Sequence, residues 1–260
     1  MSILLFIVLF LIGFLGSLVS GMLGIGGSII KYPMLLYIPP LLGLTAFTAH
    51  EVSGLSAVQV FFSTIGGVWV FRNGYYLNMK LIIYMGSSII VGSFIGGYGS
   101  ILLNDIMINI TYAILATIAA IMMFVPNKGL YDISLKEVTF NKLLATSIAL
   151  LVGIAAGVVG AAGAFILVPI MLVILKIPTR MTIASSLAIT FLSSVGSVVG
   201  KIATSQVLLW PAIIVVIASL LGGPIGANIS KKIDTKVLQI ILSVLILATA
   251  IKLWFDMLVQ

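Results

Sequence analysis

The feature that limits this chain most is a series of long apolar runs with almost no charge inside them. The runs cover residues 3–38, 41–71, 81–103, 107–125, 143–175, 181–200, 207–229 and 237–258. Only 7% of the residues are charged and 62% are hydrophobic, whereas soluble domains carry about 25% charged residues. Because a membrane-spanning helix needs about 20 apolar residues, the sequence predicts an all-α polytopic membrane protein.

The apolar runs leave no room for a large soluble domain. The longest polar stretch, residues 126–142, has the composition of a loop. We therefore divide the chain into a first membrane repeat (1–125), a polar connecting loop (126–142) and a second membrane repeat (143–260). The first run lacks a basic start and continues into further apolar sequence, so we expect a membrane segment there and not a cleaved signal peptide.

Composition also excludes several classes of function. Cysteine is absent, and the chain has 1 histidine and 6 acidic residues, so we expect no metal site and no cofactor. No Ser/His or paired-aspartate arrangement supports an intramembrane enzyme, and no G-x-x-x-x-G-K-[ST] loop supports ATP hydrolysis. We assign the net charge of +7 to basic loops that orient the protein in the lipid bilayer, and not to nucleic-acid binding.

A glycine-rich segment interrupts the first apolar run. Residues 20–33, SGMLGIGGSIIKYP, hold four glycines, a lysine and a proline. Glycine weakens a helix by roughly 1 kcal/mol per site and an interior proline by roughly 3 kcal/mol, so we expect the helix to break here.

The same pattern returns in the second half of the chain. An offset of 136 relates four residues of the first copy (Gly21, Gly24, Gly27, Pro33) to four of the second (Gly157, Gly160, Gly163, Pro169). GSFIGG at 92–97 and GGPIGA at 222–227 form a further pair. The sequence therefore predicts an internal duplication of about four apolar runs in each half, an arrangement common in transporters.

The orientation of the two repeats follows less directly. With eight simple crossings, the basic loops at 72–80 and 126–142 lie on one face and those at 176–180 and 230–236 on the other. One half then contradicts the positive-inside rule. An odd number of crossings per half, each broken run counting as two, makes the repeats inverted and gives about ten helical pieces. The alternative is that the charge bias is too weak to decide; we favour inverted repeats.

A broken helix in a membrane exposes backbone groups that only protein or a water-filled cavity can satisfy. The start of the second half-helix presents free N–H groups and the positive end of the helix dipole, and this combination binds anions. The backbone candidates for substrate binding are Gly24, Gly26, Gly27, Ser28, Gly160 and Gly163. The alternative is close helix packing through small residues, but the repetition with a proline at the same spacing favours a substrate site.

Ionisable and hydroxyl residues inside other runs add candidates. His50 and Glu51 are assigned to proton coupling, because intramembrane ionisable residues are functional candidates by default; the alternative places both near the membrane surface. The corresponding region of the second half offers Ser185, Ser186 and Thr190 as donors to an anion. Their alternative is a hydrogen bond to the carbonyl four residues earlier.

Two lysines are given simpler roles at this point. Lys31 lies four residues past Gly27, where it can attract anions or extend to the membrane interface, and we favour the interface. Lys201 flanks an apolar segment and is interpreted as a charge that sets topology.

The glycine-rich copies GMLGIGGSIIKYPMLL and GAAGAFILVPIML resemble the duplicated signature of the TauE/SafE sulfite exporter family. The chain length, the polar loop in the middle and the GGPIGA segment are similar as well, so the resemblance spans nearly the whole chain. It implies an integral membrane transporter of small sulfur-containing anions in a prokaryotic plasma membrane. The second copy departs from the pattern at Ala162, which stands where the first copy has Gly26.

These observations together predict a secondary transporter, a permease or exporter, of a small sulfur-containing anion such as sulfite or an organosulfonate. Coupling to protons is part of this hypothesis. The alternative functions are an anion channel and a membrane scaffold that transports nothing. The expected partners are the small anion and the lipid bilayer; the sequence leaves the oligomeric state open.

Overall fold

The computed structural model describes residues 2–24, 28–71, 77–123, 138, 140–160 and 164–259. The described residues form ten α-helices and one short 3-10 helix, and no strand. The helices of the first half are α1 (Ile3–Leu23), α2 (Ser28–Leu41), α3 (Ala49–Phe71), α4 (Met79–Gly99), η1 (Ser100–Leu102) and α5 (Asp105–Met123). Those of the second half are α6 (Lys142–Val159), α7 (Ala164–Val173), α8 (Thr179–Ala203), α9 (Leu209–Lys232) and α10 (Thr235–Val259).

Seven of the described helices are long and apolar enough to cross a membrane, which confirms the all-α polytopic fold. The helices α2 and α7 have 14 and 10 residues, fewer than the roughly 20 that a crossing requires. Each follows a long helix closely, so each is the short second piece of a broken apolar run. The predicted number of helical pieces, about ten, is therefore also correct.

Both predicted breaks occur at a glycine in the left-handed conformation. The helix α1 ends at Leu23 and Gly24 follows with φ of 74°, and α6 ends at Val159 with Gly160 at φ of 69°. Residues with a Cβ rarely adopt such a φ, so these glycines end the helices without strain.

The matched prolines stand at the same place in the two short helices. Pro33 is five residues past Ser28, the start of α2, and Pro169 is five residues past Ala164, the start of α7. Proline has no N–H, so Pro33 leaves the carbonyl of Ile29 without its usual helical donor. The hydroxyl of Thr249 on α10 donates to that carbonyl at 3.2 Å. A neighbouring helix thus restores the missing hydrogen bond, as the lipid surroundings require.

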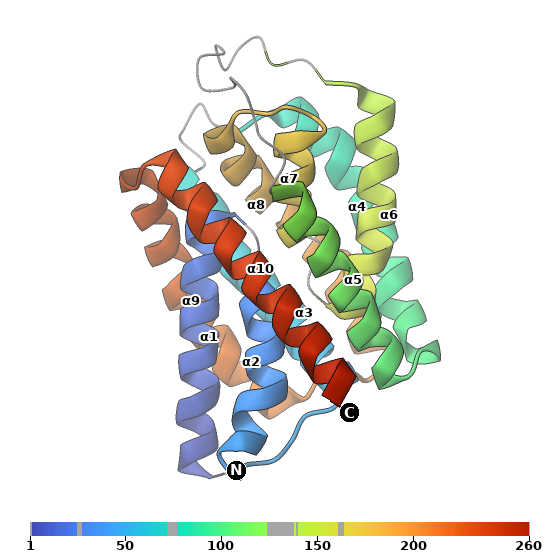
Figure 1. Ribbon diagram of the computed structural model, residues 1–260, viewed down its shortest axis with the longest axis vertical. Helices are drawn as coiled ribbons and strands as arrows, with labels where there is room; N and C mark the ends of the chain where they lie inside the picture. The colour runs from blue at the N-terminus through green and yellow to red at the C-terminus, as the bar shows by residue number, and fades with distance from the viewer. Residues whose placement is uncertain are drawn as a thin grey trace.

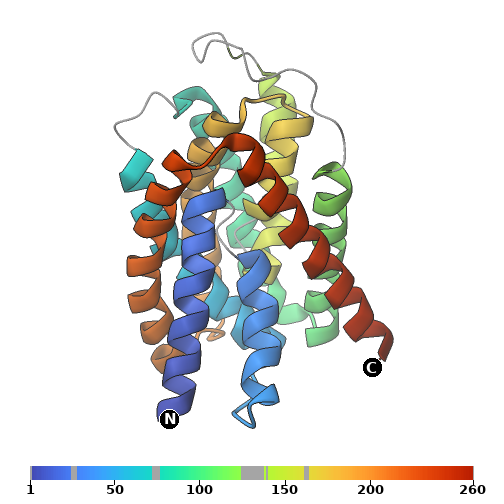
Figure 2. The same ribbon diagram turned by 60° about the vertical axis from the view of Figure 1, so that its left-hand side comes forward.

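Consecutive helices run in alternating directions, and the two halves begin in opposite ones. Figures 1 and 2 show α1 rising from the end of the molecule that holds the N-terminus, and α6 descending from the opposite end. The helix α2 returns beside α1 (Figure 2), so each half contains an odd number of helical pieces, five among the described residues. The helices pack in corresponding pairs, α1 on α9 and α6 on α4, with α3 on α8 at the centre. The inverted repeat itself stays a prediction.

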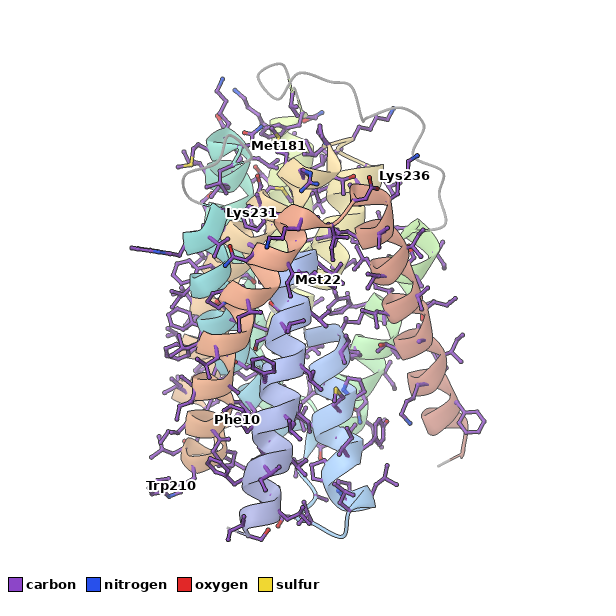
Figure 3. The ribbon with its side chains drawn as sticks, turned by 90° about the vertical axis from the view of Figure 1, so that its left-hand side faces the viewer. Phe10, Met22, Met181, Trp210, Lys231 and Lys236 are labelled. Carbon is purple, nitrogen blue, oxygen red and sulfur yellow. The ribbon has the colours of Figure 1, made fainter. Side chains whose placement is uncertain are left out.

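The described basic residues of the connecting segments consequently lie at one end of the molecule (Figure 3). The guanidinium of Arg180 donates to the carbonyl of Ser230 at 3.4 Å and to that of Ile233 at 3.1 Å, and Lys231 donates to the carbonyl of Val70 at 2.6 Å. Figure 3 shows Lys231 and Lys236 at this end and Trp210 towards the other. The described basic residues of the connecting segments in both halves, Lys80, Lys142, Arg180 and Lys231 among them, share this end, as the positive-inside rule requires.

Glycine pairs bring the principal helices into backbone contact. A Cβ on Gly96 would overlap the carbonyl oxygen of Ile154 in α6, and a Cβ on Gly226 would overlap that of Leu18 in α1. These residues belong to the GSFIGG and GGPIGA segments, so in α4 and α9 the small residues serve close packing between helices. The division of the chain into two repeat units stays a prediction.

We expect single cysteines to report the two faces separately, because the native chain contains none. A cysteine replacing Asn104, an exposed residue at the end with few basic residues, should react with a membrane-impermeant maleimide in intact cells. Cysteines replacing Lys80 or Lys232 should react only after the cells are permeabilised. Labelling of Lys232→Cys and Asn104→Cys from the same side would contradict this topology.

Substitution at Gly96 should be costly, because the overlapping atom belongs to the backbone of another helix. We expect Gly96→Ala to reduce the free energy of unfolding by about 1–3 kcal/mol, the usual range for overpacking. Gly99→Ala is the matched control, since a Cβ there meets nothing within 4 Å. Thermal unfolding in detergent compares the two, and equal stability of both variants would show that the α4–α6 contact is looser than described.

Candidate substrate site

The central pair of helices, α3 and α8, carries most of the buried polar side chains. Each has a polar stripe, a row of fully buried polar residues spaced three or four residues apart. The stripe of α3 comprises Ser53, Ser56, Gln59 and Ser63, and that of α8 comprises Ser186, Thr190, Ser193, Ser197 and Lys201. A spacing of three or four residues places side chains on one face of a helix. The interior of this membrane protein is therefore polar along its central contact.

Some of these polar groups are satisfied and others are not. The hydroxyl of Ser53 donates to the carbonyl of His50, three residues earlier in its own helix, at 2.8 Å. Buried atoms without a partner among the described residues are the hydroxyl oxygens of Ser56, Thr190, Ser193 and Ser197 and the amide oxygen of Gln59. A buried polar group left without a hydrogen bond costs roughly 1–3 kcal/mol. These atoms mark where a polar solute or water would be stabilised.

The two helix breaks lie against the first turns of the two central helices. The hydroxyl of Ser186 on α8 donates to the carbonyl of Gly24 at 2.7 Å. At the second break, a Cβ on Gly160 would overlap the carbonyl of Ser53 on α3. The structure thus brings the predicted residues Gly24 and Ser186 together, and it places Gly160 beside the α3 stripe.

Four further residues are predicted to bind substrate through their backbone. Gly26, Gly27 and Gly163 lie outside the described residues. Ser28 is the first residue of α2. The anion role of all four stays a prediction.

Ser185 and Thr190 differ in their surroundings. The backbone N–H of Asn78 donates to the hydroxyl of Ser185 at 3.1 Å, so this hydroxyl holds the start of α4. Thr190 is fully buried with its hydroxyl unpartnered. Of the two, Thr190 is therefore the one whose hydroxyl is available to a solute.

His50 and Glu51 lie at the end of the molecule where α3 begins. The carboxylate of Glu51 accepts from the N–H of Thr48 at 2.9 Å, while the Thr48 hydroxyl accepts from the N–H of Glu51 at 3.2 Å. This reciprocal pair is a capping box, which satisfies backbone donors at the start of a helix. Glu51 thus has a structural role in α3, and its part in proton coupling stays a prediction.

The ring of His50 connects three elements at the same end. Its Nδ1 lies 2.7 Å from a carboxylate oxygen of Asp105 on α5, and its Nε2 lies 3.2 Å from the carbonyl oxygen of Ser100 on η1. Both ring nitrogens therefore face oxygen acceptors, one from a carboxylate and one from a backbone carbonyl. The proximity of Asp105 is not evident from sequence, because the two residues are 55 positions apart.

The structure corrects the interpretation of Lys31 and Lys201. Neither side chain reaches an interface: both are 0% exposed. Lys201 donates to the hydroxyl oxygen of Ser100 at 2.7 Å, to the carbonyl of Val158 at 2.9 Å and to the amide oxygen of Gln206 at 2.8 Å. Lys31 has no hydrogen-bond partner among the described residues. The polar stripe on α8 was the sequence signal for Lys201, since Ser193, Ser197 and Lys201 follow each other at intervals of four.

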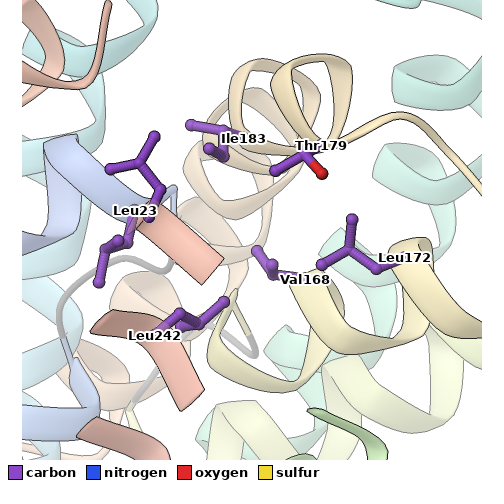
Figure 4. A pocket seen from close by; sticks show the side chains of 7 residues that line it. Leu23, Val168, Leu172, Thr179, Ile183 and Leu242 are labelled. Atoms are coloured by element: carbon purple, nitrogen blue, oxygen red, sulfur yellow. The ribbon is translucent and has the colours of Figure 1, made fainter. Parts of the chain in front are cut away.

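Two described cavities are apolar and contain none of the predicted site residues. One lies between α1, α7, α8 and α10 and is lined by Leu23, Val168, Leu172, Thr179, Ile183, Leu238 and Leu242 (Figure 4). The other, of about 290 Å³, is a groove between α2 and α10 that includes Tyr37 and Lys252. The ammonium of Lys252 stands 4.4 Å from the ring centre of Tyr37. Polar groups for substrate are concentrated on α3 and α8 and not in these cavities.

Comparison with known proteins identifies the family. The family model described as sulfite exporter TauE/SafE matches residues 9–253. A probable membrane transporter protein of Bacillus subtilis, YunE, is 23% identical over 96% of this chain and 98% of its own length. A probable membrane transporter protein of Methanocaldococcus jannaschii is 26% identical over 92% of this chain and 90% of its own length. No solved structure matches.

The family match covers all ten helices wholly or in part, and its relatives of similar length are named as membrane transporters. Together with the polar interior between α3 and α8, this places the chain in the sulfite exporter TauE/SafE family of integral membrane transporters.

Proposed function

We propose that this transporter is a secondary permease or exporter of a small sulfur-containing anion, such as sulfite or an organosulfonate. The observation that supports an anion best is the chemistry of the described interior. Hydroxyl, amide and ammonium groups are buried there, and these groups donate hydrogen bonds. The described carboxylates of Glu51, Asp105 and Asp234 lie at helix ends, so the interior favours negative over positive solutes.

The family name supports sulfur as the central atom, and the site chemistry fits an oxyanion. Sulfite and sulfonate groups present three oxygen atoms that accept hydrogen bonds. The unpartnered hydroxyls of Ser56, Thr190, Ser193 and Ser197 are donors of the kind that such oxygens accept from. A scaffold that transports nothing has no need of unsatisfied polar groups between its central helices, because each costs stability.

Transport by purified protein in proteoliposomes tests this proposal. We expect uptake of radiolabelled sulfite or methanesulfonate above its equilibrium level when a proton gradient is imposed, and no uptake of a quaternary ammonium ion of similar size. Movement limited to the downhill direction would support an anion channel instead. Absence of any anion flux from correctly folded protein would support the scaffold.

Thr190→Val should weaken anion transport, because it removes an unpartnered hydroxyl at nearly constant volume. A hydrogen bond to a charged group contributes about 1.5–3 kcal/mol, which corresponds to roughly a tenfold or greater rise in KM. Ser194→Ala is the control, since the Ser194 hydroxyl already donates to the carbonyl of Phe191 in its own helix. Equal KM values for the two variants would remove Thr190 from the proposed site.

Proton coupling through Glu51 is part of the same proposal and has a clean test. Glutamine also completes a capping box, so Glu51→Gln should keep the start of α3 intact. We expect this variant to transport anion downhill but to lose accumulation driven by the proton gradient. Asp234→Asn, at the opposite end, is the matched carboxylate control. Accumulation by Glu51→Gln at the native level would assign Glu51 to capping alone.

A further inference from the structure

Lys31 is a buried lysine whose amino group has no hydrogen-bond partner among the described residues. It lies in the first turn of α2 and is 0% exposed. Its aliphatic stem packs against Gly16 of α1, where a Cβ would overlap the Cγ and Cδ atoms of the lysine. Its Nζ atom has no hydrogen-bond partner among the described residues. The glycine thus makes room for a lysine whose charge nothing described there satisfies.

Lys201 provides the internal comparison, because it is the same residue type with the same burial. Its three N–H bonds are directed at three described oxygen atoms, those of Ser100, Val158 and Gln206. The Ser100 hydroxyl donates its own proton to the carbonyl of Gly97 at 2.7 Å, so it accepts from the lysine. Lys201 is therefore a satisfied part of the structure, and Lys31 is not.

The carboxylates described in the structure already contact other groups, so none of them is the counter-charge for Lys31. Glu51 caps α3, Asp105 contacts His50, and Asp234 accepts from the N–H of Lys236 at 2.8 Å. An uncompensated charge in a membrane interior is costly and marks a functional residue. The counter-charge is then expected from outside the described protein.

Lys31 and the polar stripe of α3 both contact the same stretch of α1. The amide of Gln59 donates to the carbonyl of Gly13 at 2.8 Å and to the hydroxyl of Ser17 at 3.3 Å. The stem of Lys31 packs on Gly16, which belongs to the same stretch of α1. The first turn of a helix adds the positive end of its dipole to the charge of the lysine.

We propose that Lys31 is the substrate-binding cation of this transporter, and that the transported anion is its counter-ion in the loaded state. This inference rests on the proposed function, and it names the residue that carries the charge recognition. The ligand class is a small oxyanion of one or two negative charges. Its oxygen atoms take one contact from the ammonium and others from the unpartnered hydroxyls of the polar stripes, a set that does not include Lys201.

The test is the thermal stability of purified protein in chloride-free buffer, with and without sulfite or methanesulfonate. Ligand that binds only the folded state raises the melting temperature. We expect the anion to raise the melting temperature of the native protein by several degrees. We expect no such rise in Lys31→Met, whose melting temperature without anion should equal or exceed the native value because an uncompensated charge has been removed.

Lys201→Met is the matched control and should behave in the opposite way. Its melting temperature should fall without ligand, because three acceptors lose their donor. The rise on adding anion should persist. If anion raises the melting temperature of Lys31→Met over the same concentration range as that of the native protein, the inference is overturned.

Gly16→Ala gives a second measure that retains the charge. The added methyl group displaces the lysine stem, so we expect the anion concentration for half-maximal stabilisation to rise about tenfold, a modest loss of affinity. In the Lys31→Met variant, Gly16→Ala should have no further effect on the response of the melting temperature to anion. If the native protein transports the anion, and Lys31→Met and Gly16→Ala bind it as tightly as the native protein does, the proposed function stands and this inference fails. If native protein neither binds nor transports any of the anions, both fail.

Discussion

The arrangement of this protein depends on the requirement that every buried backbone polar group finds a partner inside the protein, because lipid supplies none. Unbroken helices meet that requirement by themselves. The helices are interrupted at Gly24 and Gly160, and at both places a neighbouring helix donates a hydrogen bond to a carbonyl at or near the break. Ser186 donates to the carbonyl of Gly24, and Lys201 donates to the carbonyl of Val158, two residues before Gly160. The interruptions are thus placed where α8 can satisfy them.

The second requirement is close approach of helices in a solvent that gives no hydrophobic drive for association. Glycine faces on α4 and α6, and on α1 and α9, bring backbones into direct contact. These tightly packed pairs flank α3 and α8, whose polar side chains then lie at the centre of the molecule.

Much of the fold could be predicted from sequence, because the signals for it are local. Apolar runs of known length predicted the helices, and glycine with a repeated proline predicted both breaks. The same information could not locate Lys31, since a lysine near a helix end reaches an interface or turns inward depending on which helix lies beside it. Here Gly16 of α1 opens the inward position. Nor could it pair His50 with Asp105, or Lys201 with Ser100, because those contacts depend on how α5, η1 and α8 are placed in space.

One consequence concerns α8 as a mechanical element. Its first turns are bonded to the end of α1 through Ser186, and its last turn is bonded to the end of α6 through Lys201. A helix held by hydrogen bonds at two places along its length cannot shift along its axis without changing the geometry of both bonds. The two helix breaks are therefore coupled through α8: an axial shift that alters the hydrogen bond at Gly24 also alters the one at Val158, beside the second break.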